Sequence, residues 1–132
     1  MKKVFDNIAI AQSLVPAVIT STTNGSAVDT LGYHDGMVEI LAGTIDVSSG
    51  NETYAFSVEH SDDGSTGWTA VSGLTNTVTA NNQTKEIRLA ELNLTLKRYL
   101  RVVATLGGTT PSFAGAACVV LGNPIKGAVG ND

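Results

Sequence analysis

Apolar and polar residues alternate with a period of two through much of this chain. In residues 54–61, Phe56, Val58 and His60 fall on one face, and mostly polar residues fall on the other. Residues 98–106 alternate in the same way and are followed by a Gly-Gly pair. A period of two is typical of a half-buried antiparallel strand. We therefore predict a strand in each segment, with one face buried.

Turn-forming residues divide the rest of the chain into short segments. Asn24-Gly25 and residues 48–51 are typical turn sequences, and the DDGS sequence at 62–65 combines backbone-binding aspartates with a glycine that tolerates positive φ. Roughly seven to nine short strands separated by such turns are typical of a sandwich. The predicted fold is an all-β, antiparallel β-sandwich with jelly-roll or immunoglobulin-like topology.

A chain of 132 residues is expected to form one domain with two extensions. Residues 1–16 have no clear period and end at Pro16, which cannot donate a ladder hydrogen bond, so they are predicted to be an N-terminal arm or an edge strand. Residues 17–121 are predicted to form the sandwich. The glycine-rich residues 122–132 are predicted to be an extended C-terminal tail.

Two segments interrupt the strand pattern. Gly43 lies inside an apolar run and predicts a β-bulge. Leucines at 89, 92 and 96 have the spacing of a helix, but they also suit a loop that plugs one end of the sandwich.

The charge is low and unevenly distributed. Only 15% of the residues are charged, the formal net charge is −4, and no Lys or Arg occurs between Val4 and Thr84. Opposite charges are expected to meet across a sheet; the alternative is an acidic face and a basic face that meet neighbouring subunits. Because so few basic residues are available to neutralise phosphates, nucleic acid is not an expected partner.

No set of residues has the spacing of a catalytic or metal site. The DDGS turn lacks the alternating ligands and the final glutamate of an EF-hand calcium loop. His34-Asp35 and Glu59-His60 are adjacent pairs, and adjacent side chains on a strand point to opposite faces. No nucleophile has a base at a meaningful spacing. We therefore expect a protein that is not an enzyme and uses no cofactor or metal.

Trp68 and Cys118 are both expected in the hydrophobic core. The alternative for Trp68 is an exposed platform for sugar, although such platforms usually combine several aromatic rings. Cys118 is the one cysteine, so no internal disulfide can form. Since no segment approaches the roughly 18 apolar residues of a membrane helix, we expect a soluble protein with no membrane partner.

Five segments carry a family resemblance: FSVEHSDDGSTGWTAV, RYLRVVAT and CVVLGNP, and, nearer the start, DNIAIAQSLVPAVITSTTNG and VDTLGYHDGMVEILAGT. Together they resemble small structural proteins from the head gene clusters of tailed bacteriophages. They cover most of the chain and are strand and turn patterns rather than catalytic signatures. The resemblance implies a virion component of jelly-roll or immunoglobulin-like architecture, made in the host cytoplasm and bound to the capsid exterior as a cement or decoration protein.

Such a protein would stabilise the shell by bridging subunits of the major capsid protein, and copies of it would associate as dimers or trimers. The expected contact elements are the arm, the turn at 32–36, the polar loop at 76–83 and the C-terminal tail. Removing residues 1–13 is then expected to weaken capsid binding and to leave the domain folded. The candidate interface residues are Lys2, Lys3, Val4, Phe5, Ile8, Ile10, Leu14, Tyr33, His34, Asn81, Asn82, Pro124, Ile125 and Lys126.

Two other functions are compatible with the sequence. A tail- or fibre-associated module that binds host-surface carbohydrate predicts Trp68 or Tyr54 exposed beside polar loops. A minor head-completion protein predicts a low copy number in the particle. A count of copies in purified virions separates the second alternative from a cement protein.

Overall fold

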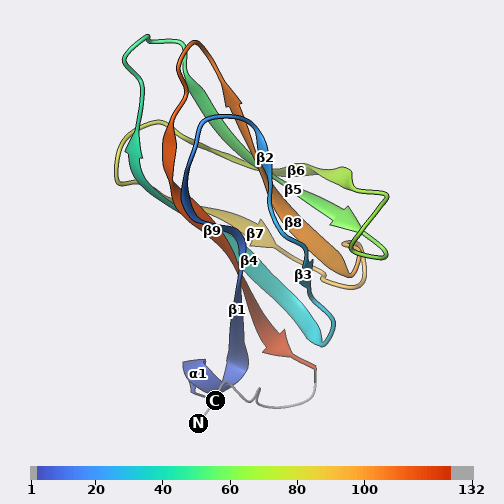
Figure 1. Ribbon diagram of the computed structural model, residues 1–132. Coiled ribbons are helices and arrows are strands. Elements are labelled where there is room, and N and C mark those ends of the chain that lie inside the picture. Colours follow the sequence, from blue (N-terminus) through green and yellow to red (C-terminus); the bar gives the residue numbers. More distant parts are fainter. Residues whose placement is uncertain (1–2, 126–132) are drawn as a thin grey trace.

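The computed structural model describes residues 3–125, which form two antiparallel sheets packed face to face (Figure 1). We call the four-stranded sheet, with strand order β1-β9-β4-β7, sheet A; the other sheet, with order β2-β8-β5-β6 and β3 also paired to β8, is sheet B. The predicted all-β sandwich is confirmed. The elements are α1 (Val4–Asn7), β1 (Ile8–Ile19), β2 (Thr23–Asn24), β3 (Val28–Asp29), β4 (Tyr33–Ile45), β5 (Thr53–Ser61), β6 (Thr69–Val78), β7 (Thr84–Leu89), β8 (Tyr99–Gly107) and β9 (Phe113–Pro124).

The core lies between the inner faces of the two sheets. Phe56 and Val58 on β5 are fully buried, as their alternation predicts, and Tyr54 is buried beside them. The Phe56 ring packs against Phe113 of sheet A with centroids 5.0 Å apart. The predicted inner face of β8 is also confirmed, since Leu100, Val102 and Ala104 are buried. Sheet A contributes Val38, Ile40, Ala117, Val119 and Leu121.

The N-terminal segment is more continuous than its sequence pattern indicates. Of the two alternatives for residues 1–16, an arm or an edge strand, the structure shows an edge strand from Ile8 onward: β1 forms the edge of sheet A, paired with β9, and continues through Pro16 to Ile19. The β1–β9 register shifts between Leu14 and Ala17. Pro16 lies in that irregular stretch, where a missing N–H donor does not interrupt a regular ladder. Residues 8–16 are therefore part of the sandwich.

Asn24-Gly25 was expected to close a tight turn, but this pair instead lies at the end of β2, where the chain runs beside β8 in sheet B. Asn24 belongs to β2, and the Gly25 N–H donates to the carbonyl of Val102 on β8 at 2.7 Å. A Cβ on Gly25 would lie 2.6 Å from that carbonyl oxygen and closer still to Ser13 Oγ. The glycine is needed here for close approach of the two chains, not for its turn conformation.

Other expectations about connections are confirmed. The leucines at 89, 92 and 96 are all buried without forming a helix: Leu89 ends β7, and residues 90–96 are the loop that closes one end of the sandwich. The Leu92 N–H in this loop donates to the His34 carbonyl at 2.9 Å. The β4–β9 register shifts between Ala42 and Ile45, around Gly43, where a bulge was predicted.

Three ion pairs join the acidic first part of the chain to the basic later part. Arg98 pairs with Asp29 at 2.8 Å, Arg101 with Glu59 at 2.6 Å, and Lys97 with Asp62 at 3.2 Å. Glu59 and Arg101 lie directly opposite each other on β5 and β8. The uneven charge of the sequence therefore reflects cross-strand pairing in these cases.

Candidate interaction surface

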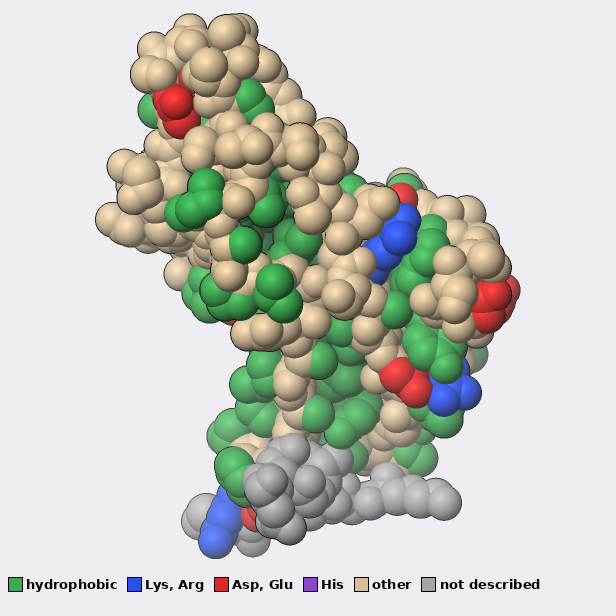
Figure 2. Space-filling view, viewed as in Figure 1, with side chains coloured by type: hydrophobic (Ala, Val, Ile, Leu, Met, Phe, Trp, Pro, Cys, Tyr) green, Lys and Arg blue, Asp and Glu red, His purple; other side chains and the backbone are tan. Residues whose placement is uncertain are grey.

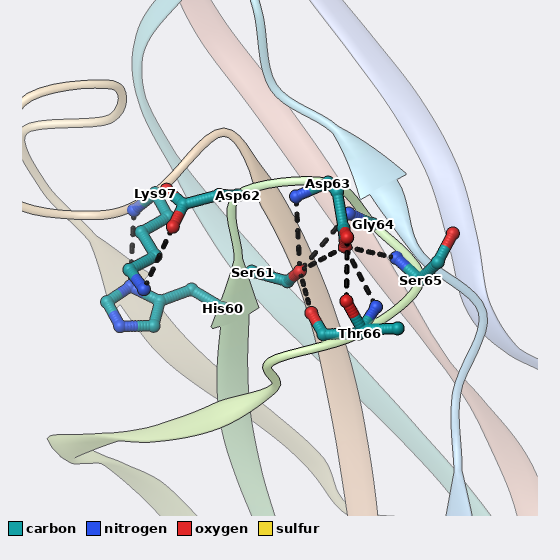
Figure 3. Close-up of polar contacts among 8 residues, drawn as sticks. All are labelled: His60, Ser61, Asp62, Asp63, Gly64, Ser65, Thr66 and Lys97. Carbon is teal, nitrogen blue, oxygen red and sulfur yellow. Dashed lines mark hydrogen bonds and ion pairs between the residues drawn. The ribbon is translucent and has the colours of Figure 1, made fainter.

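The DDGS sequence forms a self-contained turn, as predicted (Figure 3). Asp63 Oδ1 accepts hydrogen bonds from the backbone N–H groups of Ser65 and Thr66, both at 2.8 Å, and Oδ2 accepts from Thr66 Oγ1 at 2.7 Å. These bonds hold the pKa of Asp63 far below its usual range, with the Thr66 backbone bond the largest cause. Gly64 takes a φ of +75°. Residues 3–125 contain no group of three or more His, Cys, Asp or Glu side chains that could hold a metal ion.

His60 also has a local structural role. Its Nδ1 accepts the Lys97 backbone N–H at 3.1 Å, which orders the end of the 90–96 loop (Figure 3). Desolvation, followed by the positive charge of Lys97, lowers the pKa of His60, while Asp62 opposes this shift. The neutral imidazole is thus the form that fits this site.

Trp68 does not lie in the core, which corrects the expectation from the sequence. Its side chain is partly exposed, and the Arg101 guanidinium lies over the ring at 4.5 Å from the centroid. Arg101 alternates with the buried Leu100 and Val102, so it is on the outer face of sheet B. The guanidinium and the indole form a cation–π contact on this outer face, and neither side chain enters the core.

Cys118 is likewise outside the core. Its neighbours Ala117 and Val119 are buried, so Cys118 points to the outer face of sheet A, between Gln12 and Glu39 in the strand register. Burial and then the charge of Glu39 raise the pKa of its thiol. The apolar run around Cys118 suggested burial, but strand alternation puts it on the opposite side.

One end of the molecule gathers three of the predicted contact elements. Tyr33 pairs with Pro124 across β4 and β9, and the Ile125 N–H donates to the Gly32 carbonyl at 2.8 Å. Helix α1 lies at this same end (Figure 1). The arm, the turn at 32–36 and the start of the C-terminal tail are therefore neighbours in space.

Several predicted contact residues at this end are exposed. We define the apolar tip by its exposed side chains: Val4 is 73% exposed, Phe5 60%, Ile10 64% and Ile125 52%. Val4, Phe5, Ile8 and Ile10 line a hollow of about 420 Å³. Lys3 and His34 are exposed, while Ile8, Tyr33 and Pro124 are partly buried.

The remaining predicted contact residues do not join the apolar tip. Leu14 is only 6% exposed and belongs to the core, because the irregular register near it turns its side chain inward; it is not an interface residue. Asn81 and Asn82 are exposed at the other end of β4: Asn81 Oδ1 accepts the Ile45 N–H, and the Asn82 N–H donates to Gly43. Lys2 and Lys126 lie outside the described residues.

The outer face of sheet A is rich in apolar residues and continues the apolar tip. In Figure 2, hydrophobic side chains gather in the lower half of the view, around β1 and its neighbours in sheet A. The strand register aligns Ile10, Val120 and Met37 in one row across the sheet, and Leu41 and Ala116 in another. Ile10 and Leu41 are exposed, the latter by 47%. In contrast, the outer face of sheet B carries Ser57, Glu59, Thr75, Thr77, Arg101 and Thr105.

A pair of acidic residues lies within this outer face. Glu39 on β4 is directly opposite Glu86 on β7, and Cys118 flanks Glu39 on the other side. Glu39 Oε2 is buried and has no hydrogen-bond partner among residues 3–125. Burial, followed by the charge of Glu86, raises the pKa of Glu39. Sequence reasoning missed this face because apolar residues occur at both even and odd positions of residues 37–42, so the pattern does not show which side is buried.

Comparisons with known proteins do not place the chain in a family. No family model matches it, and no relative was found among curated proteins. In the described part of the chain, no helix is long and apolar enough to cross a membrane.

Proposed function

We propose that this chain is a non-enzymatic structural virion protein, a cement or decoration protein that binds the outer capsid surface. In this role it bridges subunits of the major capsid protein and so stabilises the shell. The observation that carries the proposal is the apolar tip, where Val4 and Ile10 are among the most exposed hydrophobic residues. The resemblance of five segments to phage head proteins supplies the biological context.

The apolar tip has the character of a docking surface. Exposed apolar clusters of this kind mark interaction sites, because leaving them in water carries a free-energy cost that a partner removes. The tip unites segments from both ends of the described chain with the turn at 32–36. A specific contact buries about 1,000 Å² in total, so the tip would act together with adjoining surface.

The edge of sheet A offers a second mode of contact. Among the described residues, β1 pairs only with β9 and forms the outer strand of the sheet. An extended segment of a capsid subunit can add to such an edge through main-chain hydrogen bonds, which make few sequence demands. Preferential binding to the assembled shell stabilises that shell by mass action.

Copy number in purified particles tests the proposed role. We expect hundreds of copies per virion, counted by quantitative mass spectrometry against the major capsid protein. A cement protein covers a surface lattice, whereas a head-completion or tail component occupies one vertex. A few copies per particle would contradict the cement role.

Substitutions in the apolar tip test the proposed surface. Val4→Asp together with Ile125→Asp should reduce binding to particles that lack the protein by at least tenfold, because charges replace exposed apolar contacts. Thr77→Asp, on the polar outer face of sheet B, is the matched control and should bind like wild type. Equal binding by all three proteins would exclude the tip as the contact.

A carbohydrate-binding module is a second candidate, favoured by the position of Trp68 outside the core. Two observations limit it: Arg101 covers one face of the indole, and Tyr54, the other expected platform residue, is only 1% exposed. Binding on a glycan array that is lost in Trp68→Ala would support this candidate. An array without a Trp68-dependent signal would remove it.

A further inference from the structure

The outer face of sheet A contains an acidic pair whose electrostatic environment is incomplete within the chain. Glu39 and Glu86 lie directly opposite each other on β4 and β7. Like charges in this position destabilise a sheet. In addition, Glu39 Oε2 is shielded from solvent and accepts no hydrogen bond from residues 3–125. Glu86, in contrast, is exposed, so a cation from outside the monomer can reach the acidic pair and offset its repulsion.

Arg88 is a cation on the same face that has no ionic partner. It lies opposite Met37, two residues from Glu86 on β7, and its side chain is exposed. Arg88 forms no ion pair within the described part of the chain, whereas Lys97, Arg98 and Arg101 each bind an acid. Each copy thus presents an acidic pair and a free guanidinium on one surface.

Apolar residues surround these charges. Ile10, Val120 and Met37 continue the Arg88 row across sheet A, and Leu41 and Ala116 lie beyond the acidic row. A surface with apolar residues on both sides of a charged centre can bury area and fix register at the same time.

We propose that the outer face of sheet A is the interface of a two-fold symmetric homodimer, in which Arg88 of each copy pairs with Glu86 and Glu39 of the other. A two-fold axis that crosses the strands between Met37 and Glu39 places the Arg88 row of one copy over the Glu86 row of its partner. The same operation creates the contact twice, as an isologous interface requires. The occupant of this face is therefore a second copy of the chain.

The size of the face sets the expected strength. Four strands about 4.8 Å apart, over roughly seven residues of about 3.4 Å each, give a face of about 19 by 24 Å. This is smaller than the roughly 800 Å² that each partner contributes to a standard interface. We therefore expect a dimer that dissociates on dilution. The inference does not depend on a capsid role, because it is tested on the isolated protein.

Sedimentation velocity of the full chain over a dilution series provides the first measurement. Wild type should change from monomer to dimer along the series and be largely dimeric at about 100 μM, the upper end of the series. Arg88→Glu and Glu86→Lys should each raise the dissociation constant at least tenfold, because each faces like charge in its own homodimer. Thr77→Lys, on sheet B, alters charge elsewhere and should dimerise normally.

Mixing the two variants tests the proposed charge pairing directly. A one-to-one mixture of Arg88→Glu and Glu86→Lys restores opposite charges at both symmetric contacts. Heterodimers should therefore form at the concentration at which wild type forms homodimers. Circular dichroism and thermal melting establish that each variant is folded. A monomeric wild type at about 100 μM would overturn the inference. A dimer that the single variants leave intact, or a folded mixture that stays monomeric, would also overturn it. Binding of this face to capsid shells by a strictly monomeric protein would assign it to a different occupant.

Discussion

Several polar side chains near the surface of this protein stabilise turns and connections. Asp63 uses both carboxylate oxygens inside its own turn, and Ser61 Oγ donates to the Thr66 carbonyl across the same turn. His60 accepts a backbone N–H, and Asp62 binds Lys97 (Figure 3). At this scale, adjacency in sequence explains the bonds within the turn, while those to Lys97 depend on the fold.

Asp63→Ala should lower the melting temperature at neutral pH, because the Ser65 and Thr66 N–H groups lose their acceptor. The folded pKa of Asp63 lies below its ordinary value of 3.8. The stabilisation by the Asp63 carboxylate is therefore fully present above pH 3.8 and is lost as the pH falls through the folded pKa. Melting curves of wild type and variant should converge in strong acid. Asp62→Ala, which removes one exposed ion pair, should have a smaller effect. An equal effect of both variants at neutral pH would contradict this account.

Glu39→Gln should stabilise the monomer at neutral pH by about 0.5 kcal/mol, the scale of a cross-strand charge pair. The folded pKa of Glu39 is raised above its ordinary value of 4.5. The contribution of Glu39 to folding stability is therefore most favourable below pH 4.5, and it is lost as the pH rises through the folded pKa. Melting at low protein concentration should show the gain at pH 7 and none below 4.5.

Glu52→Gln is the control of opposite sign. Its carboxylate accepts backbone N–H groups of Ser49 and Asn51, with the Ser49 bond the largest cause of its lowered pKa. Loss of the charge should destabilise the protein at neutral pH. A destabilised Glu39→Gln monomer at pH 7 would show that the Glu39 carboxylate has a partner after all.

At the scale of elements, Ser13 on β1 joins sheet A to the segment that follows β2 and to β8 of sheet B. Ser13 on β1 is 2% exposed; its Oγ donates to the Ser26 carbonyl at 2.8 Å and accepts the Val102 N–H at 2.9 Å. The Ser26 N–H returns a bond to the Ser13 carbonyl at 2.7 Å. Gly25 fits between them without a side chain. These contacts fix an edge strand to the centre of the opposite sheet.

Ser13→Ala should therefore destabilise the fold by about 2 kcal/mol, since it leaves a buried Val102 N–H without its acceptor. Urea denaturation measures this difference. Ser72→Ala, at an exposed position of β6, is the matched control and should change stability by less than about 0.5 kcal/mol. Equal midpoints for the two variants would show that water replaces the Ser13 hydroxyl.

For the whole molecule, the boundary between arm and domain lies near residue 7 rather than residue 16. Helix α1 has no buried residue, while β1 begins at Ile8 and carries the buried Ser13 and Leu14. A deletion of residues 1–13 would therefore remove part of a sheet together with the arm. A shorter deletion separates capsid binding from folding.

Removing residues 1–7 should leave cooperative thermal unfolding in place, because none of the described residues 3–7 is buried. Removing residues 1–13 should lower stability by several kcal/mol through loss of the Ser13 bonds and half of β1. Both are measured by melting, with capsid binding assayed only for folded protein. A stable, cooperative 1–13 deletion would show that β1 contributes little to the sandwich.

The strand pattern explains which predictions hold. The inner faces of β5 and β8 were predictable because polar residues mark their outer faces clearly. On β4 and β9 both faces carry apolar residues, so the periodicity alone does not say which face is buried. This ambiguity led to the wrong placement of Cys118. Trp68 was wrongly predicted to lie in the core. Its partly exposed ring is instead covered on one face by the guanidinium of Arg101, a residue distant in the sequence.

By itself, the sequence determined the all-β class, the Asp63 turn, the bulge near Gly43 and the inner faces of the clearly alternating strands. These features depend on local backbone preference and on contrast between neighbouring residues. The tertiary structure alone decided that Leu14 is buried and that the two ends of the described part, residues 3–125, share an apolar tip. It also decided that Glu39, Glu86 and Arg88 lie together on an outer face. Such placements depend on which strands pair and at what register, and strand pairing joins residues that are far apart in the chain.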